Sequence, residues 1–395
     1  MSVPAKRPET LKINVEPTAV PLLDVARGTA PLRDEILQAI EEVVDSGRFI
    51  NGPDVKKLEE TVAQITGAKH AIACASGSDA LVLALMALDV GPGDEVICPS
   101  FTFFATASAA WRLGAKPVFV DIEPGTFNID PRQIEAAITS STKAIIPVHL
   151  FGQCANMDPI QEIAAKHGIA VVEDAAQSIG ATYEGRGAGS IGQVGCFSFY
   201  PTKNLGAMGD GGMLTANDDR IADKLRLLAA HGMSPRYYHQ VVGINSRLDS
   251  IQAAILNVKI KHLATWTRQR QENAEHYFSL FSQTSLHRNL VLPKTLPNCG
   301  HVWNQFTVRV PHGGRDALRS QLAAAQIGSE IYYPVPLHQQ ECFLELGYRP
   351  GSLPETERAA REVLSLPIFP ELTAAERTVV VRRMESILSE KRAAA

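Results

Sequence analysis

The sequence lacks the features that mark several large classes of protein. Its six cysteines lie far apart, with no CxxC pair and no cluster of cysteine and histidine at zinc-ligand spacing. It contains neither a GxxxxGK phosphate-binding loop nor a GxGxxG dinucleotide fingerprint. The 38 basic and 42 acidic residues give a formal net charge of −4, so no overall field draws the chain to nucleic acid or an anionic membrane. We therefore expect no metal site, no nucleic-acid partner and no membrane partner.

Long apolar segments are also absent. The N-terminus, MSVPAKRPETLKINVEP, carries charges and prolines without the apolar core of a signal peptide, and we expect residues 1–19 to form a loose tail. The most uniform apolar run extends from Ala80 to Leu88, which is too short to span a bilayer. Four of the cysteines lie in apolar or small-residue surroundings, as free buried thiols do. These features favour a cytoplasmic protein in a reducing compartment.

A regular alternation of short apolar runs and helix-compatible segments occupies about residues 68 to 230. The runs expected to be strands are Ala71 to Ala75, Glu95 to Pro99, Pro117 to Ile122, Lys143 to His149 and Ile169 to Asp174. Buried strands joined by helices predict a mainly parallel sheet covered on both faces. Ligands of such sheets bind at the carboxyl ends of the strands.

The second half of the chain predicts a smaller α/β domain. No proline or glycine interrupts residues 249–282, where apolar residues recur at helical spacing, so one long helix is expected there. A strand over Val302 to Val310 and a helix from Arg315 follow. We expect a large domain over residues 20–257 and a small C-terminal domain over residues 258–395.

Helix starts are signalled at three places. Asp130 precedes Pro131 with Gln133 three residues on, and Asp158 precedes Pro159. Thr373 and Glu376 have the spacing of a capping box.

The stretch ASGSDA is a candidate phosphate site. Gly77 allows close approach of backbone to backbone, and the amides of Ser78 and Asp79 open the helix, where free N–H groups and the dipole favour an anion. A plain helix cap is an equally good interpretation of the motif alone.

Two ionisable side chains follow strands in the same region. Asp174 comes directly after an apolar strand, where a carboxylate needs a cationic partner from the protein or from a cofactor. Lys203 lies in CFSFYPTKNLGAMGDGG, and a lysine amine made neutral by its surroundings attacks carbonyl groups. A phosphate cradle, an acid at a strand end and a lysine together are the three anchors of pyridoxal phosphate. Phe103, in SFTFFAT, is a candidate for stacking on the ring, with core packing as the alternative.

The sequence closely resembles the DegT/DnrJ/EryC1/StrS family of aminotransferases that act on nucleotide-linked keto sugars. The matching stretches are FINGPDVKKLE, SGSDAL, GPGDEVICPSFTFFATA, EDAAQSIGA, FSFYPTKNLGAMGDGG, GINSRLDSIQAAIL, YYPVPLHQQ and LSLPIFPEL, in the family's order over about residues 20 to 385. The resemblance implies the fold of fold type I aminotransferases, with a parallel sheet and a smaller C-terminal domain.

The resemblance also implies roles for individual residues. Lys203 is similar to the Schiff-base lysine and proton shuttle, Asp174 to the partner of the pyridinium nitrogen, and Gln177 to the residue beside the phenolic oxygen of the cofactor. The phosphate-binding positions are matched by Ser78, Asp79 and Ser198, beside Gly77, and the ring-stacking position by Phe103. Asn245 matches a residue that reaches the phosphate in the neighbouring subunit, which implies a homodimer with shared active sites.

The implied reaction moves an amino group from an amino acid, L-glutamate by family habit, to the ketone of a nucleotide-linked sugar. IYYPVPLHQQECFLELGY and RYYHQ resemble members that act on 3-keto sugars, including UDP-linked 3-keto uronates. Arg236 is a candidate for holding a sugar carboxylate or the diphosphate, with a solvent-facing role as the alternative. Tyr333 and His338 are candidate sugar contacts, and packing at the domain joint is the alternative for both. We expect His149 and His231 to be structural histidines outside the catalytic set.

Other functions remain open at this point. Some family dehydratases have histidine in place of the lysine, so Lys203 favours a transaminase over a dehydratase or lyase. A catalytically idle member acting as a regulatory or scaffold protein is a second alternative. A nicotinamide oxidoreductase is a third by topology, and the missing GxGxxG weighs against it.

Overall fold

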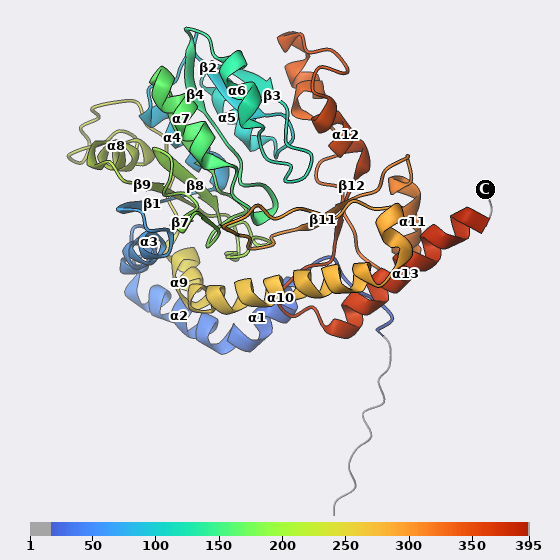
Figure 1. Cartoon of the computed structure of the whole chain (residues 1–395). Helices are drawn as coiled ribbons and strands as arrows, with labels where there is room; N and C mark the ends of the chain where they lie inside the picture. The colour runs from blue at the N-terminus through green and yellow to red at the C-terminus, as the bar shows by residue number, and fades with distance from the viewer. Residues whose placement is uncertain (1–16, 394–395) are drawn as a thin grey trace, which may run out of the picture.

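A seven-stranded sheet forms the centre of the computed structural model, which describes residues 17–393 (Figure 1). The loose tail predicted at residues 1–19 lies almost wholly outside this range. In spatial order the strands are β1 (His70–Cys74), β9 (Gly212–Ala216), β8 (Val194–Ser198), β5 (Ala170–Asp174), β4 (Thr142–Ile145), β2 (Glu95–Pro99) and β3 (Lys116–Val120). The strands from β8 to β3 are parallel, whereas β9 is antiparallel to both of its neighbours. The predicted mainly parallel sheet is therefore confirmed.

Helices cover both faces of this sheet. Successive side chains of each strand point to opposite sides, so the apolar strands present side chains to be buried on both faces. Ile72 of β1 and Val172 of β5 pack in one apolar cluster, and their neighbours Ala71 and Val171 pack in two others. The first face is covered by α4 (Gly77–Ala87), α5 (Ala105–Arg112) and α8 (Asp219–Ala229). The second is covered by α3 (Pro53–Thr66), α6 (Pro131–Ala137), α7 (Met157–His167) and α9 (Ser250–Lys259).

A long helical segment leads from the large sheet to the C-terminal part, as Figure 1 shows along its lower edge. It consists of α9, the 3₁₀ turn η3 (Ile260–His262) and α10 (Leu263–Ser282), with α1 (Val25–Thr29), η1 (Ala30–Leu32) and α2 (Arg33–Ser46) below it. The C-terminal part contains β11 (Phe306–Arg309), α11 (Arg315–Ala324), α12 (Pro354–Glu362), β12 (Val363–Leu366) and α13 (Ala374–Ala393). The antiparallel pair of β11 and β12 packs with α10, α11 and α13 in one apolar cluster. The exact domain boundary at residue 257 stays a prediction.

Short elements complete the chain. A small sheet is formed by β6 (Thr182–Tyr183), β7 (Arg186–Gly187) and β10 (Cys299–Gly300). The 3₁₀ turns are η2 (Leu150–Gly152), η4 (Ser285–Arg288), η5 (Leu337–Gln339) and η6 (Glu341–Leu346).

The boundary predictions were right in part. Asp130 caps α6 and the Thr373–Glu376 capping box forms, but α7 begins at Met157, so the expected start at Asp158 was late. The predicted long helix is interrupted by the 3₁₀ turn η3. The strand expected from Val302 starts only at Phe306, because Trp303 has a left-handed backbone conformation with φ of 47°.

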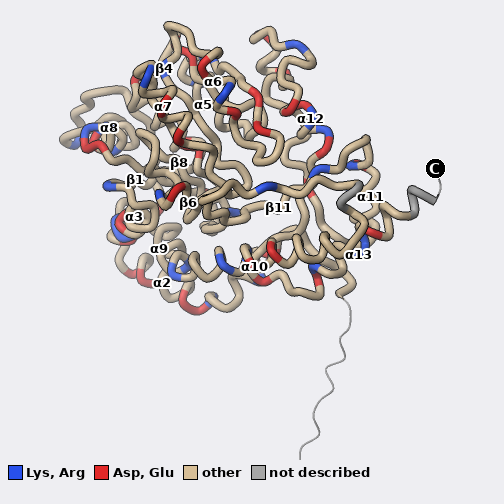
Figure 2. The backbone as a smooth tube through the Cα atoms, in the orientation of Figure 1, with Lys and Arg blue, Asp and Glu red and all other residues tan. Residues whose placement is uncertain are grey.

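The charge distribution agrees with the balanced composition. Figure 2 shows acidic and basic residues interspersed over the molecule. Cys74, Cys98, Cys154 and Cys196 are buried free thiols, as expected. Within residues 17–393, no helix is long and apolar enough to cross a membrane, and no group of histidine, cysteine and carboxylate residues is arranged to hold a metal ion.

Candidate active site

A cavity of about 630 Å³ lies at the carboxyl ends of the central strands. It is walled by the ends of β5 and β8, the start of α4, the loop after β2 and the segment before η5. Eight of the residues singled out by sequence line it: Gly77, Ser78, Phe103, Asp174, Gln177, Ser198, Lys203 and Tyr333. The fold thus brings together residues that are far apart in the chain.

The amino end of α4 forms one end of the cavity. The Ser76 hydroxyl accepts the N–H of Asp79 at 3.1 Å, which leaves the amides of Gly77 and Ser78 in the first turn for a ligand. A Cβ atom at Gly77 would lie 2.7 Å from the Cβ of Ser198, so only glycine lets α4 approach β8 this closely. Free amides, the helix dipole and the Ser198 hydroxyl suit a phosphate group.

Asp174 is a buried carboxylate at the end of β5. Its Oδ2 accepts the Thr106 hydroxyl at 2.7 Å and its Oδ1 accepts the N–H of Ala176 at 3.2 Å. Burial raises the pKa of Asp174, while the hydrogen bond from Thr106 lowers it. An acid held in this way can pair with a protonated ring nitrogen in the cavity.

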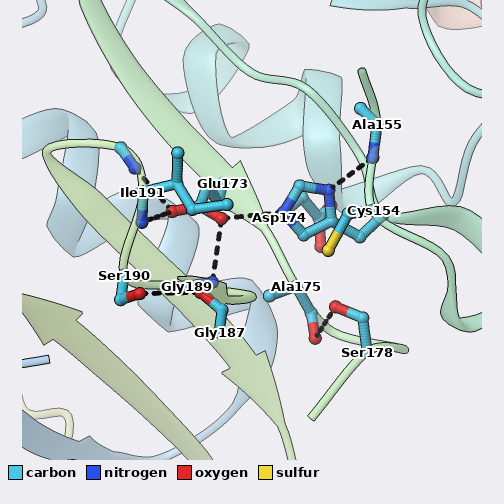
Figure 3. A network of polar contacts seen from close by, with 12 residues as sticks. Cys154, Ala155, Glu173, Asp174, Ala175, Ser178, Gly187, Gly189, Ser190 and Ile191 are labelled. Carbon is cyan, nitrogen blue, oxygen red and sulfur yellow. Dashed lines mark hydrogen bonds and ion pairs between the residues drawn. The ribbon is translucent and has the colours of Figure 1, made fainter. Parts of the chain in front are cut away.

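The preceding residue, Glu173, belongs to a separate buried network (Figure 3). It accepts the His149 ring nitrogen Nε2 at 2.8 Å and the backbone N–H groups of Gly189, Ile191 and Gly192 at 2.6 to 2.8 Å. Burial opposes its ionisation, but these hydrogen bonds hold the pKa of Glu173 below its usual value. His149 accepts the N–H of Ala155 on Nδ1, so the ring donates through Nε2. This histidine fixes the loop after β4 to β5.

Lys203 lies in the loop after β8, and its backbone N–H donates to the Tyr200 carbonyl at 2.9 Å. Burial lowers the pKa of the Lys203 amine to about 8 from 10.5, although Asp174 acts in the opposite direction. Near pH 8 about half of the amine is therefore neutral and nucleophilic.

Three further side chains shape the wall between these groups. Gln177 accepts the N–H of Phe151 at 2.6 Å and donates from Nε2 to the Tyr333 hydroxyl at 3.3 Å. The rings of Phe103 and Tyr333 lie 6.2 Å apart, and Phe103 is 57% exposed toward the open space. An exposed phenylalanine at this position has room to stack on a planar ring.

Four residues singled out by sequence are not among the described residues that line the cavity: Asp79, Asn245, Arg236 and His338. The carboxylate of Asp79 accepts the Ser246 hydroxyl, and His338 is buried between Ser100 and Glu357. Arg236 and Asn245 are exposed, in a loop outside this chain's cavity. Their roles stay predictions.

Sequence reasoning missed several lining residues. They are Ser76, Thr102, Tyr200, Asp210, Gln305 and Tyr332, with Thr106 behind Asp174. Asp210 stands in the glycine-rich stretch quoted above and Thr102 adjoins Phe103, so their positions carried a signal. The position of Gln305 carried no such signal, because this residue lies far along the chain from the strands whose carboxyl ends form the cavity.

Comparison with known proteins identifies the chain. The sheet order and the site define a fold type I aminotransferase. The model of the DegT/DnrJ/EryC1/StrS aminotransferase family matches residues 31–385, so the chain belongs to this family, as expected. Membership of an aminotransferase family excludes the alternative of a nicotinamide oxidoreductase.

Similar proteins cover almost the whole chain. A pleiotropic regulatory protein of Geobacillus stearothermophilus is 53% identical over 92% of this chain and 97% of its own length. A UDP-N-acetyl-3-dehydro-alpha-D-glucosamine 3-aminotransferase of Acidithiobacillus ferrooxidans is 48% identical over 90% and 94%. The crystal structure of DesV from S. venezuelae, in complex with a ketimine intermediate, has a TM-score of 0.90 and 42% identity and covers 93% of this chain and 98% of that one.

Proposed function

We propose that the protein is a pyridoxal-phosphate-dependent aminotransferase that moves an amino group from an amino acid to the ketone of a nucleotide-linked sugar. One observation carries the proposal: Lys203 and Asp174 line one cavity whose far end is the amino terminus of α4. Family membership and the similarity to named sugar aminotransferases support it.

The residues present fit this cofactor. The amides of Gly77 and Ser78 and the Ser198 hydroxyl would hold its phosphate, and Asp174 would hold the proton on its ring nitrogen. Phe103 would cover one face of the ring, and Gln177 would hold the phenolic oxygen. When bound, the cofactor accepts an amino group from a donor and passes it to a ketone, with its protonated ring as the electron sink.

Lys203 is the protein side chain proposed to bind the cofactor covalently and to transfer the proton. Its Nζ would form the covalent link that holds the cofactor at rest, and when released it would take up and return the proton at the reacting carbon. Its lowered pKa suits both tasks, because the amine has to be neutral to attack and to accept a proton.

The substrate class follows from the relatives. We propose a 3-keto sugar, since the Acidithiobacillus ferrooxidans protein is named for a 3-dehydro sugar, and L-glutamate as the donor by family habit. Tyr333 lines the cavity beside Gln177, which supports a role for it as a sugar contact. The nucleotide and the stereochemistry are left to experiment.

A homodimer with shared sites is part of the proposal. Among the described residues that line the cavity, Lys203 is the single lysine or arginine, whereas the ligands carry a phosphate, a diphosphate and a carboxylate. Cations and hydrogen-bond donors from a second copy would balance this charge, and Asn245 and Arg236 are exposed as such a role requires. A cytoplasmic setting stays a prediction from the free cysteines.

The test runs the reaction backwards, with UDP- and dTDP-linked amino sugars added to the protein loaded with pyridoxal phosphate. The expected result is loss of the absorbance of the bound aldehyde form with the amino sugar alone. In a separate sample, glutamate alone should cause the same loss and release 2-oxoglutarate. Lys203→Ala and Lys203→Arg should both lose the borohydride-stable cofactor adduct. Protein that stays colourless with added cofactor would point to the regulatory alternative, which the name of the Geobacillus stearothermophilus relative keeps open. Sugar turnover without 2-oxoglutarate would indicate a dehydratase or lyase.

A further inference from the structure

Two buried threonines form a chain of hydroxyl groups that ends on Asp174. The Thr106 hydroxyl donates to Asp174 Oδ2 at 2.7 Å, and the hydroxyl oxygens of Thr102 and Thr106 lie 3.1 Å apart. Thr106 is fully buried and Thr102 is 2% exposed.

The direction of this chain follows from the number of protons. A threonine hydroxyl has one hydrogen, and that of Thr106 is given to the carboxylate. The oxygen of Thr106 therefore accepts, and Thr102 donates to it. Both hydroxyl groups therefore donate in the direction of Asp174, which stabilises the ionised carboxylate. The negative charge also shortens the hydrogen bond from Thr106.

The surroundings of Asp174 make this donation matter. Burial raises the pKa of the carboxyl group, and the Thr106 hydroxyl is the foremost of the groups that lower it, ahead of the Ala176 amide, Lys203 and His149. Three further titratable groups face Asp174, and burial raises the pKa of each, so they stay neutral: Cys98, Cys196 and Tyr333. His149 is committed to Glu173. Without Thr106, the buried acid would more readily take up a proton itself.

The same hydrogen bond joins two walls of the cavity. Thr106 lies in the first turn of α5, and its backbone N–H donates to the Phe103 carbonyl at 3.3 Å. Phe103 is therefore anchored, through Thr106, to the end of β5 that carries Asp174. The ring-facing phenylalanine and the acid share one support.

We propose that Thr106, with Thr102 behind it, is a positioning residue that holds Asp174 as an oriented anion and so sets the protonation of the cofactor ring nitrogen. The inference rests on the proposed function, since it concerns the group that Asp174 would face. Thr106 acts through Asp174 and need not touch the cofactor.

The experiment compares wild-type protein, Thr106→Val and Thr106→Ser, each loaded with pyridoxal phosphate carrying ¹⁵N at the ring nitrogen. Valine keeps the shape of threonine and removes the donor, whereas serine keeps the donor. We expect the ¹⁵N shift of wild type and Thr106→Ser to report a protonated ring at neutral pH, and that of Thr106→Val to move toward the unprotonated value. The cofactor dissociation constant of Thr106→Val should rise about tenfold, as for a lost hydrogen bond to a charged group.

Further variants separate this role from a purely structural one. In an Asp174→Ala background, Thr106→Val should add little to the loss of affinity, because the group it acts on is gone. Thr102→Val should shift the ¹⁵N signal in the same direction by less, and it provides the measurement if Thr106→Val does not fold. A wild-type ¹⁵N shift in folded Thr106→Val, or in Thr102→Val where the first variant fails to fold, would overturn the inference. Wild-type protein that binds no cofactor would instead remove the proposed function.

Discussion

Glu173 and Asp174 are consecutive carboxylates on β5 with separate sets of partners. Glu173 accepts His149 and three backbone amides on one side of the strand, and Asp174 lines the cavity and accepts Thr106 on the other. Alternation of side chains along a strand makes this division possible. Glu173 connects the loops around the site, whereas Asp174 faces the cavity, where we propose that it pairs with the cofactor.

Replacing Glu173 with glutamine keeps the shape of the side chain and should lower the unfolding free energy of the protein. The change removes the charge from a buried pair and turns one acceptor into a donor facing N–H groups, which costs about 3 kcal/mol of unfolding free energy. Because the pKa of Glu173 is held below its usual value, its contribution is present at neutral pH and is lost as the pH falls through the lowered pKa. Urea unfolding of the apoprotein at several pH values should show the deficit of Glu173→Gln shrinking in acid.

The exposed pair of Lys56 and Glu60 provides the control for that measurement. The Lys56 Nζ and Glu60 Oε1 atoms lie 3.8 Å apart and both side chains are exposed to solvent. Glu60→Gln should therefore change the unfolding free energy by less than about 0.5 kcal/mol. An equal effect of the two substitutions would contradict the buried-pair interpretation.

The reactivity of Lys203 toward aldehydes should depend on pH with a midpoint near 8. Only the neutral amine attacks, and burial lowers the pKa of Lys203 to about 8, so the rate should rise with pH and level off above this value. Since Asp174 favours the charged amine, Asp174→Asn should move the midpoint to lower pH. The apoprotein is treated with a small aldehyde and cyanoborohydride, and the labelled peptide is quantified by mass spectrometry.

The exposed Lys56 reports reagent concentration in the same samples. A midpoint for Lys203 near that of an ordinary lysine would show that burial does not govern this amine. A shift to higher pH in Asp174→Asn would contradict the effect of Asp174 on the charged amine.

Gly77→Ala should weaken cofactor binding. A methyl group there would lie 2.7 Å from Ser198 Cβ, so α4 has to move away from β8 at an overpacking cost of about 1–3 kcal/mol. Where this cost falls on the cofactor-bound state, the affinity drops roughly 5- to 150-fold. Alanine is the better helix former, so helix propensity cannot account for a loss. Gly91→Ala is the matched control, because a methyl group at Gly91 meets nothing within 4 Å. Equal dissociation constants for the two variants would remove Gly77 from the phosphate cradle.

The sequence predicted the parts of the site whose signal is local. Asp174 stood out because a carboxylate at the end of an apolar strand needs a partner, and Lys203 because a single amine stands in the glycine-rich loop after the neighbouring strand β8. The strand β2 occupies the residues expected for it. Thr106 was missed because its partner Asp174 is 68 residues away and a buried threonine looks like any other core residue. The hydrogen bond between His338 and Ser100 joins residues 238 positions apart, so only the folded chain shows it. The sugar contact expected of His338 stays a prediction. Strand ends were also predicted less well. The strand expected to reach His149 ends at Ile145, and beyond it Val148 forms only an isolated bridge to Asp174.

Arg236→Ala should raise the KM for the nucleotide sugar several-fold and leave the half-reaction with the amino donor unchanged. Arg236 is exposed, and its guanidinium carbon lies 4.8 Å from the ring centre of Tyr237. In the proposed dimer, this guanidinium would pair with a diphosphate or carboxylate of the substrate. Exposed Arg383, on α13, provides the control, and Arg383→Ala should alter neither half-reaction. Steady-state kinetics with sugar and donor varied separately distinguish the two effects. An unchanged sugar KM in Arg236→Ala would place this arginine in solvent, whereas equal losses in both half-reactions would indicate a disturbed dimer rather than a substrate contact.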